Sequence, residues 1–541
     1  MAQPRHYSSQ LIDHLGLVAG MYDELGIGEQ IDRLILQDSD KRTVSIGQAV
    51  KAMVLNGLGF ANRALYLTPL FFRDKPVDRL IGAGITADHL NDDVLGRTLD
   101  ALYAYGLEAV YQQVSILAVN RLGLGCRFVH MDSTSFHTDG QYNSKEEPDE
   151  GVIHITQGYS RDHRPDLNQV VLQLICERQA GIPLLMQPLS GNNSDKVSFR
   201  DMIKTHSQQL RTDFGTEYLV ADSALYTAET LKELAASGWI SRVPETLTLA
   251  CAVIDAVAPD LMADLAQKSL RSVCTNYGDV KQRWLVVYSP EAHQRAQKTV
   301  DKQCVKQSRA ELQTFEKLCL QDFACEADAR KALSAFEKKL NMTFVSNATI
   351  KALPRFNGKG RPAQDRKPDF YLYRLEGALA SMPQERVRRL QRKSCFILAT
   401  NQLNEELLSN DQLLAAYKDQ QKVERGFRFL KDPLFMAASL FLKSPQRIMA
   451  LMMIMTLCLL VYAALEHRIR DALKTNHHVF PDQKGKAITN PTTRWVFQFF
   501  GGIHLLAINQ VQTLVLNLNA HHLSLLKLLG KQYEEIYSAS G

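Results

Sequence analysis

The feature that most constrains how this chain folds is an apolar run, because such a run must be shielded from water. Residues 448–465 read IMALMMIMTLCLLVYAAL, 18 residues with Thr456 as the clear polar interruption. A run of this length reaches the minimum for a membrane span. Charged residues flank it on both sides, and the whole chain, at 45% hydrophobic and 22% charged, has the composition of a globular protein. We expect a buried core helix and no membrane; a membrane span and an interfacial or oligomer helix are the alternatives.

The bulk properties set the broad class of protein. A length of 541 residues suggests about three or four domains. The net charge of +5 favours a nucleic-acid partner only weakly, so the distribution of charge must decide. The nine cysteines form no Cys-x-x-Cys pair, which argues against a zinc ribbon or a disulfide framework. The first residues lack the pattern of a signal peptide, and we expect a cytoplasmic protein.

The first 120 residues have the pattern of helices. Ser45 is a favourable N-cap, and the apolar residues after it recur at helical spacing up to Gly57. A second helix is predicted to begin at Asn91 and to end at Gly106. We therefore expect an all-helical N-terminal domain over residues 1–120, which could read DNA ends as a helix-turn-helix module. A helical dimerisation or packing module fits the same pattern.

From residue 126 the apolar pattern changes to short strands separated by turns and helices. Two of these strands are predicted to end at an aspartate, the first at Asp132 and the fourth at Asp222. The predicted elements, in order, are a strand at 126–136, strands at 169–177 and 181–189, a helix at 197–211, a strand at 217–226, a helix at 227–237, a strand at 393–401 and a helix at 411–431.

This order of strands and helices, with a long insertion before the last strand, is the order of an RNase H-like fold. We therefore predict an α/β fold: an RNase H-like catalytic core, with a mixed five-stranded sheet and flanking helices, that carries a large insertion and follows an all-helical N-terminal domain. The acidic positions of such a core are occupied by Asp132, Asp222 and Glu424. The regions predicted after residue 120 are the two parts of the catalytic domain at 121–240 and 391–470, the insertion at 241–390, and a packing or oligomerisation region at 471–541.

The insertion combines strand-like and helical pieces with a strongly basic run. Its predicted elements are strands at 283–289 and 369–375 and, between them, a helical hairpin at about 291–340 that breaks near 321–325. Residues 351–393 hold twelve lysines and arginines against four acidic residues, a surplus of +8. The first half is loop-like because it contains Gly358, Gly360, Pro362 and Pro368. We expect this run to grip DNA phosphates, with a solvated face as the alternative. Its candidate DNA-binding residues are Arg388, Arg389 and Arg392.

The most informative segment is the predicted helix at 411–431. At about 100° per residue, four residues separated by 3, 4 and 7 positions project from one polar face. They are Tyr417, Gln420, Glu424 and Lys431. The face therefore offers a carboxylate flanked by a cation and a phenol, with Arg425 and Arg428 nearby as further DNA-binding candidates. An apolar stripe on another side of the helix can dock on the sheet.

Three carboxylates suit the cleavage of a phosphodiester. Two divalent metal ions about 3.5–4 Å apart can activate the attacking oxygen and stabilise the leaving one. Mg²⁺ takes oxygen ligands and retains waters, so a few carboxylates and DNA phosphates suffice to bind it. In the expected arrangement Asp132 bridges two metal ions, and Asp222 and Glu424 each complete one. Lys431 and Tyr417 would hold the phosphates beside the scissile bond.

These residues resemble the DDE transposases of bacterial insertion sequences, in the group with the signature Tyr-x2-Arg-x3-Glu-x6-Lys. In this chain the signature reads Tyr417-x2-Gln420-x3-Glu424-x6-Lys431, so Gln420 replaces the arginine. The resemblance extends to MDST around Asp132, VADSALY around Asp222 and GYSRDHRPDLNQ at 158–169. It covers most of the chain from about residue 120 to residue 465.

The resemblance implies an RNase H-like catalytic domain with an insertion between the second aspartate and the glutamate. It implies excision and strand transfer with two Mg²⁺ ions, or Mn²⁺ in their place. The implied partners are double-stranded DNA, as transposon terminal inverted repeats and target, and further copies of the chain in a homodimer or larger assembly on paired ends. An RNase H-like nuclease without strand transfer and a catalytically idle, transposase-derived DNA-binding protein are the alternatives. Some relatives hold a flipped base with a tryptophan of the insertion; for Trp284 a core position is the stronger expectation.

Overall fold

The computed structural model describes residues 7–37, 42–60, 65–138, 142, 149–159, 164–358, 366–432, 435, 442, 444–509 and 512–539. The chain divides into two compact units. Unit 1 comprises residues 1–241, 278–280 and 411–541, and unit 2 comprises residues 242–277 and 281–410.

Five strands that lie in unit 1 follow one another in the order β4-β3-β2-β5-β6. They are β2 (Phe128–His137), β3 (Gln169–Glu177), β4 (Pro183–Ser190), β5 (Tyr218–Ala221) and β6 (Gly238–Arg242). β3 is antiparallel to β2 and to β4, whereas β5 runs parallel to β2 and to β6. Every residue of β3 is buried, which agrees with its nearly continuous apolar sequence.

The sequence predicted four of these strands and missed β6. The predicted strand at 393–401 also forms, as β11 (Cys395–Thr400), which pairs with β8 (Val280–Tyr288). The fifth strand of unit 1 is β6, a run of five residues that begins with glycine. Trp239 and Ile240 favour a strand, but the segment is short, and its pairing with β5 completes it.

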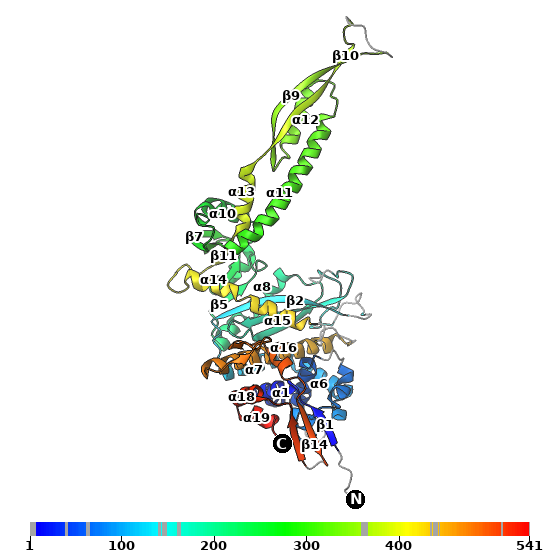
Figure 1. The fold of residues 1–541 in the computed structure, drawn as a ribbon, viewed down its shortest axis with the longest axis vertical. Coiled ribbons are helices and arrows are strands. Elements are labelled where there is room, and N and C mark those ends of the chain that lie inside the picture. Colours follow the sequence, from blue (N-terminus) through cyan, green and yellow to red (C-terminus); the bar gives the residue numbers. More distant parts are fainter. Residues whose placement is uncertain are drawn as a thin grey trace. The chain divides into compact units, whose positions relative to one another are not determined.

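Helices lie on both sides of this sheet (Figure 1). α8 (Asp195–Phe214) lies on one side, and α15 (Gln421–Leu430) and α16 (Pro445–Thr475) lie on the other. α16 and α7 (Leu107–Leu122) contact β4, and α15 contacts β2. The helix that carries Glu424 is therefore packed against the strand that carries Asp132.

α16 contains the long apolar run. An 18-residue window of this 31-residue helix has a mean hydropathy of 2.5, so the helix is long and apolar enough to cross a membrane. In the structure 83% of that window is buried inside the protein. The helices in contact with α16 include α1 (Leu15–Glu24), α3 (Ile46–Leu58), α6 (Asp92–Tyr105), α7 and α18 (Ala520–Leu529). This enclosure supports the expected core helix, because a helix that is apolar on every side must be surrounded by protein or by lipid.

The two N-terminal helices form as predicted, but α3 offers no DNA-reading face. Ser45 caps α3 in a reciprocal capping box with Gln48, and Asn91 caps α6, which ends at Gly106. Every residue of α3 except Gln48 is buried. A recognition helix must present side chains to the major groove, so α3 is a packing helix.

The prediction of an all-helical N-terminal domain is wrong at its first element. β1 (Tyr7–Leu11) is a strand, antiparallel to β14 (His504–Ile508), which also pairs with β15 (Gln512–Leu516). The two ends of the chain thus share a three-stranded sheet. β1 is short and largely exposed, so its conformation comes from a partner at the other end of the chain and not from a local apolar pattern.

Unit 2 contains three paired strands and a long β-hairpin. Three of its strands follow the order β11-β8-β7, with β7 at Ser269–Tyr277, and the antiparallel hairpin consists of β9 (Thr343–Arg355) and β10 (Phe370–Ser381). The predicted helical hairpin forms as α11 (Pro290–Cys319) and α12 (Glu326–Glu337). Two further helices, α10 (Thr248–Leu261) and α13 (Pro383–Ser394), contact each other, and α13 also contacts α11.

The basic run of unit 2 is more ordered than its sequence suggested. Residues 351–355 belong to β9 and not to a loop, because β10 pairs with them along their whole length. The rest of the predicted loop falls partly on residues 359–365, which lie outside the described residues. Trp284 is fully buried in β8, and its Nε1 donates to Oε1 of Gln282 at 3.0 Å, as expected of a core tryptophan.

The other described α-helices and strands are short. They are α2 (Ile27–Leu34), α4 (Thr68–Phe72), α5 (Val77–Leu80), α9 (Ala228–Glu233), α14 (Asn410–Lys418), α17 (Thr493–Phe499), α19 (Lys531–Ile536), β12 (Phe480–Pro481) and β13 (Ala487–Ile488).

Candidate active site

Asp132 and Asp222 occupy matching positions on neighbouring parallel strands. In the register of β2 and β5, Met131 pairs with Ala221. Asp132 and Asp222 are the residues that directly follow this pair. Neighbouring strands are about 4.8 Å apart, and paired residues project to the same face of a sheet. Because Asp222 directly follows β5, we expect its carboxylate to lie near that of Asp132.

The sequence had predicted that Asp132 lies at the end of its strand. In the structure it lies in the middle of β2. β2 continues to His137 because its second half stays paired with β3. The pairing with β5 stops one residue earlier than Asp132, where Asp222 leaves the sheet. There Oδ1 of Asp222 accepts a hydrogen bond from the backbone N–H of Ala224 at 2.9 Å, and Oδ1 of Asp132 accepts one from Ser133 at 2.8 Å. The pairing of β2 with β5 thus ends immediately before Asp132.

The face that holds these carboxylates is the face that α15 covers. Phe128 shares this face of β2 with Asp132, because side chains alternate along a strand. The guanidinium of Arg178 lies 5.2 Å from the Phe128 ring and forms an ion pair with Asp419 at 2.5 Å, just before α15. Lys422 in the first turn of α15 donates to the backbone carbonyl of Arg178 at 2.7 Å. These contacts tie the start of α15 to the site.

His130 lies between Phe128 and Asp132 on the same face and is almost completely buried. Burial disfavours the charged imidazolium and lowers the pKa of His130 to about 4. The ring is therefore neutral at physiological pH, and the aspartates gain no compensating charge from it.

The predicted helix at 411–431 is two helices. α14 ends at Lys418 and α15 begins at Gln421. At the junction Gln420 N–H bonds to Tyr417 O, and Lys422 N–H bonds to Asp419 O, which are i to i−3 bonds. Such a 3₁₀ turn winds more tightly than an α-helix and shifts the phase of the residues after it. The tie between Arg178 and Asp419 holds this turn in place.

The break changes the single polar face that the sequence predicted. Gln420 is buried at the junction, so it does not share the exposed face of Glu424, and Tyr417 is half-buried in α14. Glu424 is exposed on α15, and Arg425 and Arg428 are exposed beside it. Lys431 follows as the C-cap residue of α15.

The aspartate pair suits a divalent metal ion, whereas Glu424 is not gathered with it. No group of three or more histidine, cysteine, aspartate or glutamate side chains that could hold a metal ion occurs among the described residues. Mg²⁺ is often bound through one or two carboxylates and completes its shell with water and phosphate oxygens. Asp132 and Asp222 offer such a pair, and a cation would relieve the repulsion between them.

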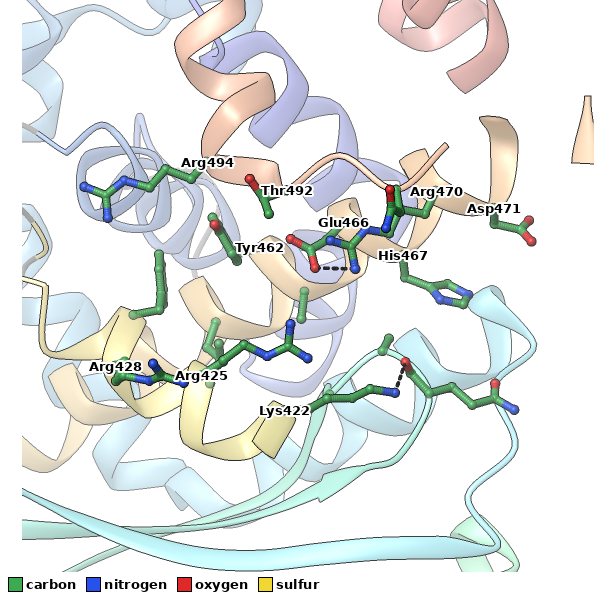
Figure 2. Close-up of a pocket in the computed structure, with 18 of the residues that line it drawn as sticks. Lys422, Arg425, Arg428, Tyr462, Glu466, His467, Arg470, Asp471, Thr492 and Arg494 are labelled. Carbon is green, nitrogen blue, oxygen red and sulfur yellow. Dashed lines mark hydrogen bonds and ion pairs between the residues drawn. The ribbon is translucent and has the colours of Figure 1, made fainter. Parts of the chain in front are cut away.

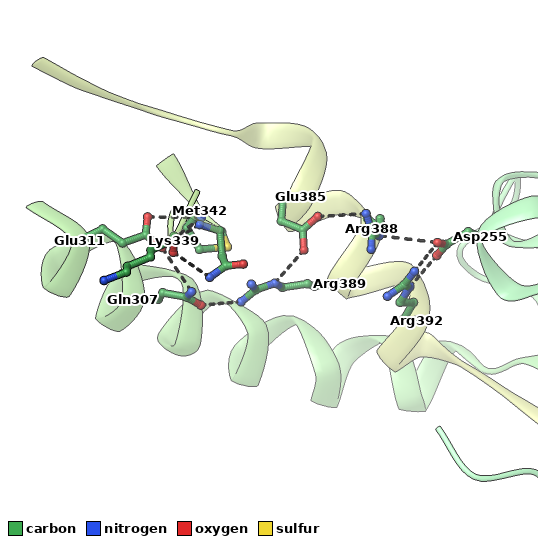
Figure 3. Close-up of polar contacts among 10 residues, drawn as sticks. Asp255, Gln307, Glu311, Lys339, Met342, Glu385, Arg388, Arg389 and Arg392 are labelled. Carbon is green, nitrogen blue, oxygen red and sulfur yellow. Dashed lines mark hydrogen bonds and ion pairs between the residues drawn. The ribbon is translucent and has the colours of Figure 1, made fainter. Parts of the chain in front are cut away.

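The arginines predicted to grip DNA hold α13 to its neighbours (Figure 3). Arg392 forms a bidentate pair with Asp255 of α10, with Nε 2.6 Å from Oδ1. Arg389 bonds to Glu385 at 3.1 Å and to Gln307 of α11 at 2.9 Å. Arg388 lies 3.5 Å from both Asp255 and Glu385. Every one of the three has an intramolecular partner, which the local sequence could not show because Asp255 and Gln307 lie far from α13 in the chain.

A cavity that the sequence gave no sign of lies beside α15 (Figure 2). Its volume is about 710 Å³, and its walls come from α15, α16, the turn between β3 and β4, and residues 489–494. Basic side chains from three separate segments line it: Lys422, Arg425, Arg428, Arg470, Lys474 and Arg494. α15 is therefore shared between the carboxylate face and a strongly basic cavity.

Comparison with protein families identifies a family that matches the chain. Residues 126–461 match the family described as "Transposase DDE domain". The match takes in more than half of the chain and includes all three proposed carboxylates. This chain belongs to the DDE transposases. The transposase also matches, over residues 7–116, a family described as "Domain of unknown function (DUF4277)".

Other comparisons add little. A solved structure, described as the cryo-EM structure of piggyBac transposase synaptic complex with hairpin DNA, is similar at 9% identity and a TM-score of 0.34. The alignment covers 92% of this chain and 82% of that chain, and a TM-score this low carries no argument. No curated protein matches the transposase. The family establishes a DNA transposase enzyme, and enzymes of this family generally use divalent metal ions.

Proposed function

We propose that this transposase excises an insertion sequence and inserts it elsewhere, by metal-dependent hydrolysis of phosphodiesters followed by strand transfer. The observation that carries the proposal is the placement of Asp132 and Asp222 at matching positions of two parallel strands, on the face that α15 covers. Glu424 is the third carboxylate of the proposed site. Its helix begins at the 3₁₀ turn around Asp419, and we expect α15 to reorient there when DNA binds.

We propose an RNase H-like catalytic domain. The strand order β4-β3-β2-β5-β6, with three antiparallel strands followed by two parallel ones, supports this assignment. The proposed organisation has a DNA-end-binding domain at 1–120, a catalytic domain at 121–240 and 391–470, an insertion domain at 241–390 and a packing or oligomerisation region at 471–541.

In this proposal each part of the site has a separate task. When two Mg²⁺ or Mn²⁺ ions are bound, they supply the activation of the attacking oxygen and the stabilisation of the leaving oxygen. Asp132 would contribute oxygens to both positions, and Asp222 and Glu424 would each contribute to one. Arg425 and Arg428 are exposed beside Glu424 and would hold DNA phosphates in line with the carboxylates. Lys431 and Tyr417 would assist them.

The proposed partners are double-stranded DNA, as terminal inverted repeats and target, and further copies of the chain in a homodimer or larger assembly in the bacterial cytosol. Gln420 is a weak candidate for DNA contact because it is buried. Arg388, Arg389 and Arg392 would have to exchange carboxylate or amide partners for phosphates.

The test is an assay on the full-length protein with labelled DNA that carries the cognate ends, in which a gel separates cleaved from joined products. Asp132→Asn keeps the size of the side chain and removes its charge. We expect cleavage to fall on the order of 100-fold or more, with DNA binding nearly unchanged. The control is Asp201→Asn, an exposed aspartate of α8 on the other side of the sheet, and we expect full activity.

Each outcome of this assay has a distinct meaning. Cleavage that survives Asp132→Asn, or DNA binding lost while cleavage persists, would contradict the assignment of the carboxylates. Cleavage without joining by the unchanged protein would identify a nuclease that lacks strand transfer. Binding without metal-dependent cleavage would identify a catalytically idle DNA-binding protein.

A further inference from the structure

The cavity beside α15 has an excess of positive charge that the protein does not neutralise. Three of its six basic side chains are engaged: Lys422 donates to backbone carbonyls, Arg470 pairs with Glu466 at 2.7 Å, and Arg494 pairs with Asp432 at 2.7 Å. The other three, Arg425, Arg428 and Lys474, form no hydrogen bond or ion pair with any residue that the structure describes. Unpaired cations on concave walls concentrate the electric field and attract anions.

The cavity also has an aromatic wall. The rings of Phe429 and Tyr462 stack with centroids 4.4 Å apart, and Phe60 meets Phe429 edge-on at 6.1 Å. All three side chains line the cavity and are half-buried. Burial raises the pKa of Tyr462 to about 12, so its phenol keeps its proton and can donate a hydrogen bond.

Aromatic rings beside unpaired cations form the pattern by which proteins bind unpaired nucleic-acid strands, since bases stack on rings and cations hold the backbone. The size of the cavity points the same way. At about 710 Å³ it lies in the range of sites for small ligands, roughly 300–1,000 Å³. A duplex, whose major groove alone is about 12 Å wide, does not fit inside.

The position of the cavity relates it to the carboxylates. Arg428 lies one helical turn after Glu424 on α15, and Arg425 lies next to Glu424 in the chain and lines the cavity. In Figure 2 Arg425 extends from α15 into the space below the Glu466–Arg470 pair. α15 packs closely on α16 because residue 426 is glycine; a Cβ there would lie 3.1 Å from Cδ2 of Leu459. A strand that leaves the carboxylate face can therefore follow Arg428 into the cavity.

We propose that this cavity between α15 and α16 binds an unpaired segment of DNA strand, with its phosphates at Arg425, Arg428 and Lys474 and a base against Phe429 and Tyr462. The inference rests on the proposed function, because the strand is taken to be the one that the carboxylates cut or join. It assigns a task to the C-terminal half of α16, which the signature around Glu424 does not include.

The experiment measures binding of a fluorescent single-stranded oligonucleotide to the full-length protein by anisotropy, with EDTA present so that no metal-dependent step takes part. The double variant Arg425→Gln with Lys474→Gln is expected to bind the strand about tenfold more weakly. The slope of log K against log salt concentration should fall by about 1.4, from about 0.7 for each lost phosphate contact. A blunt duplex of the same sequence should lose less affinity.

Lys527→Gln is the matched control, because Lys527, like Lys474, is an exposed lysine in the last turn of a helix. It should bind as the unchanged protein does. Equal losses for strand and duplex, or no loss in the double variant, would overturn the proposal. So would competition by a deoxynucleoside monophosphate as effective as that by the oligonucleotide. Because EDTA removes the metal, failure of the carboxylate assignment would appear only in the cleavage assay.

Discussion

The arginines of α13 and those of α15 are closely spaced along their helices, yet their surroundings differ. Arg388, Arg389 and Arg392 of α13 each reach a carboxylate or an amide of unit 2. Arg425 and Arg428 of α15 have no such partner among the described residues, and a third unpaired cation joins them in the cavity. The more basic segment of the sequence is therefore the one whose charges are already satisfied.

The difference matters because an ion pair must be broken before its cation can serve another anion. An exposed pair contributes only about 0–1 kcal/mol, whereas a partly buried bidentate pair contributes more. Arg392 and Asp255 are of the second kind, since their side chains are 30% and 31% exposed. We therefore expect charge density alone to overstate the DNA affinity of α13, and the number of unpaired cations to be the better predictor.

The largest expected effect tests the contrast between α13 and α15 directly. Arg425→Ala with Arg428→Ala should weaken binding of a DNA end that carries an unpaired strand by roughly tenfold to a hundredfold, because two charge-assisted contacts are lost. The melting temperature should stay almost unchanged, since neither arginine has a described partner. Binding is measured by anisotropy as a function of salt concentration.

The control for this double variant is Lys204→Ala with Arg211→Ala, two exposed basic residues of α8. Removing the same amount of charge there should change binding less than about threefold. If Arg388→Ala with Arg389→Ala weakened binding more than Arg425→Ala with Arg428→Ala, the contrast between the two helices would be wrong.

The next effect in size concerns the stability of unit 2. Asp255→Ala removes the acceptor of Arg392 and leaves that guanidinium without its bidentate partner. We expect a loss of about 1–2 kcal/mol, less than for a fully buried pair because the side chains are partly exposed. Faster hydrogen exchange in α13 and a lower melting temperature would report the loss, while DNA affinity should change less than about twofold.

A matched change for Asp255→Ala is Asp260→Ala, on the same helix. Asp260 pairs with Arg271 at 2.8 Å, but these side chains are 72% and 53% exposed. Its removal should cost less than about 0.5 kcal/mol. Equal destabilisation by the two variants would show that burial does not distinguish these pairs.

The fold of unit 1 could be predicted from the sequence where the pattern of residues is local. The apolar run of β3, the capping box at Ser45 and the aspartate directly after β5 all follow from neighbouring residues. The break at Asp419 was not readable, because it depends on Arg178 from the turn after β3. β6 escaped prediction for a similar reason, since its pairing with β5 supplies what its five residues lack.

The same limit applies to the site. The signature spacing around Glu424 predicts a catalytic helix, but nothing in the local sequence links it to Lys474 or Arg494. These residues meet at the cavity only because α16 and residues 489–494 fold back beside α15. Conversely, the surplus of +8 in residues 351–393 looks like a free surface until Asp255 and Gln307, distant in the chain, are seen to contact α13.

A smaller effect should appear in the pH dependence of the stability of unit 2. The hydrogen bond from Arg392, followed by the positive charges of Arg392 and Arg388, holds the pKa of Asp255 below its usual value of 3.8. A carboxyl whose pKa is depressed by folding stabilises the protein above its unfolded pKa, and this stabilisation disappears as the pH falls through the folded pKa. The difference in melting temperature between the unchanged protein and Asp255→Asn should be constant above about pH 5 and should shrink below pH 3.8. A difference that persists at the lowest pH would mean that the charge of Asp255 is not what stabilises α13.

The smallest expected effect comes from Arg388→Ala and sharpens the comparison within α13 itself. Arg388 lies 3.5 Å from Asp255 and from Glu385, and its side chain is 51% exposed, so its pairs are long and screened by solvent. We expect a loss of less than about 0.5 kcal/mol in unfolding free energy, well below the loss for Asp255→Ala. Of the three arginines, Arg388 also has the longest ion pairs. A DNA phosphate could therefore replace its carboxylate partners most easily. A fall in the salt dependence of DNA binding for Arg388→Ala, together with unchanged stability, would place Arg388 among the DNA-binding residues and leave Arg389 and Arg392 as the residues that hold α13.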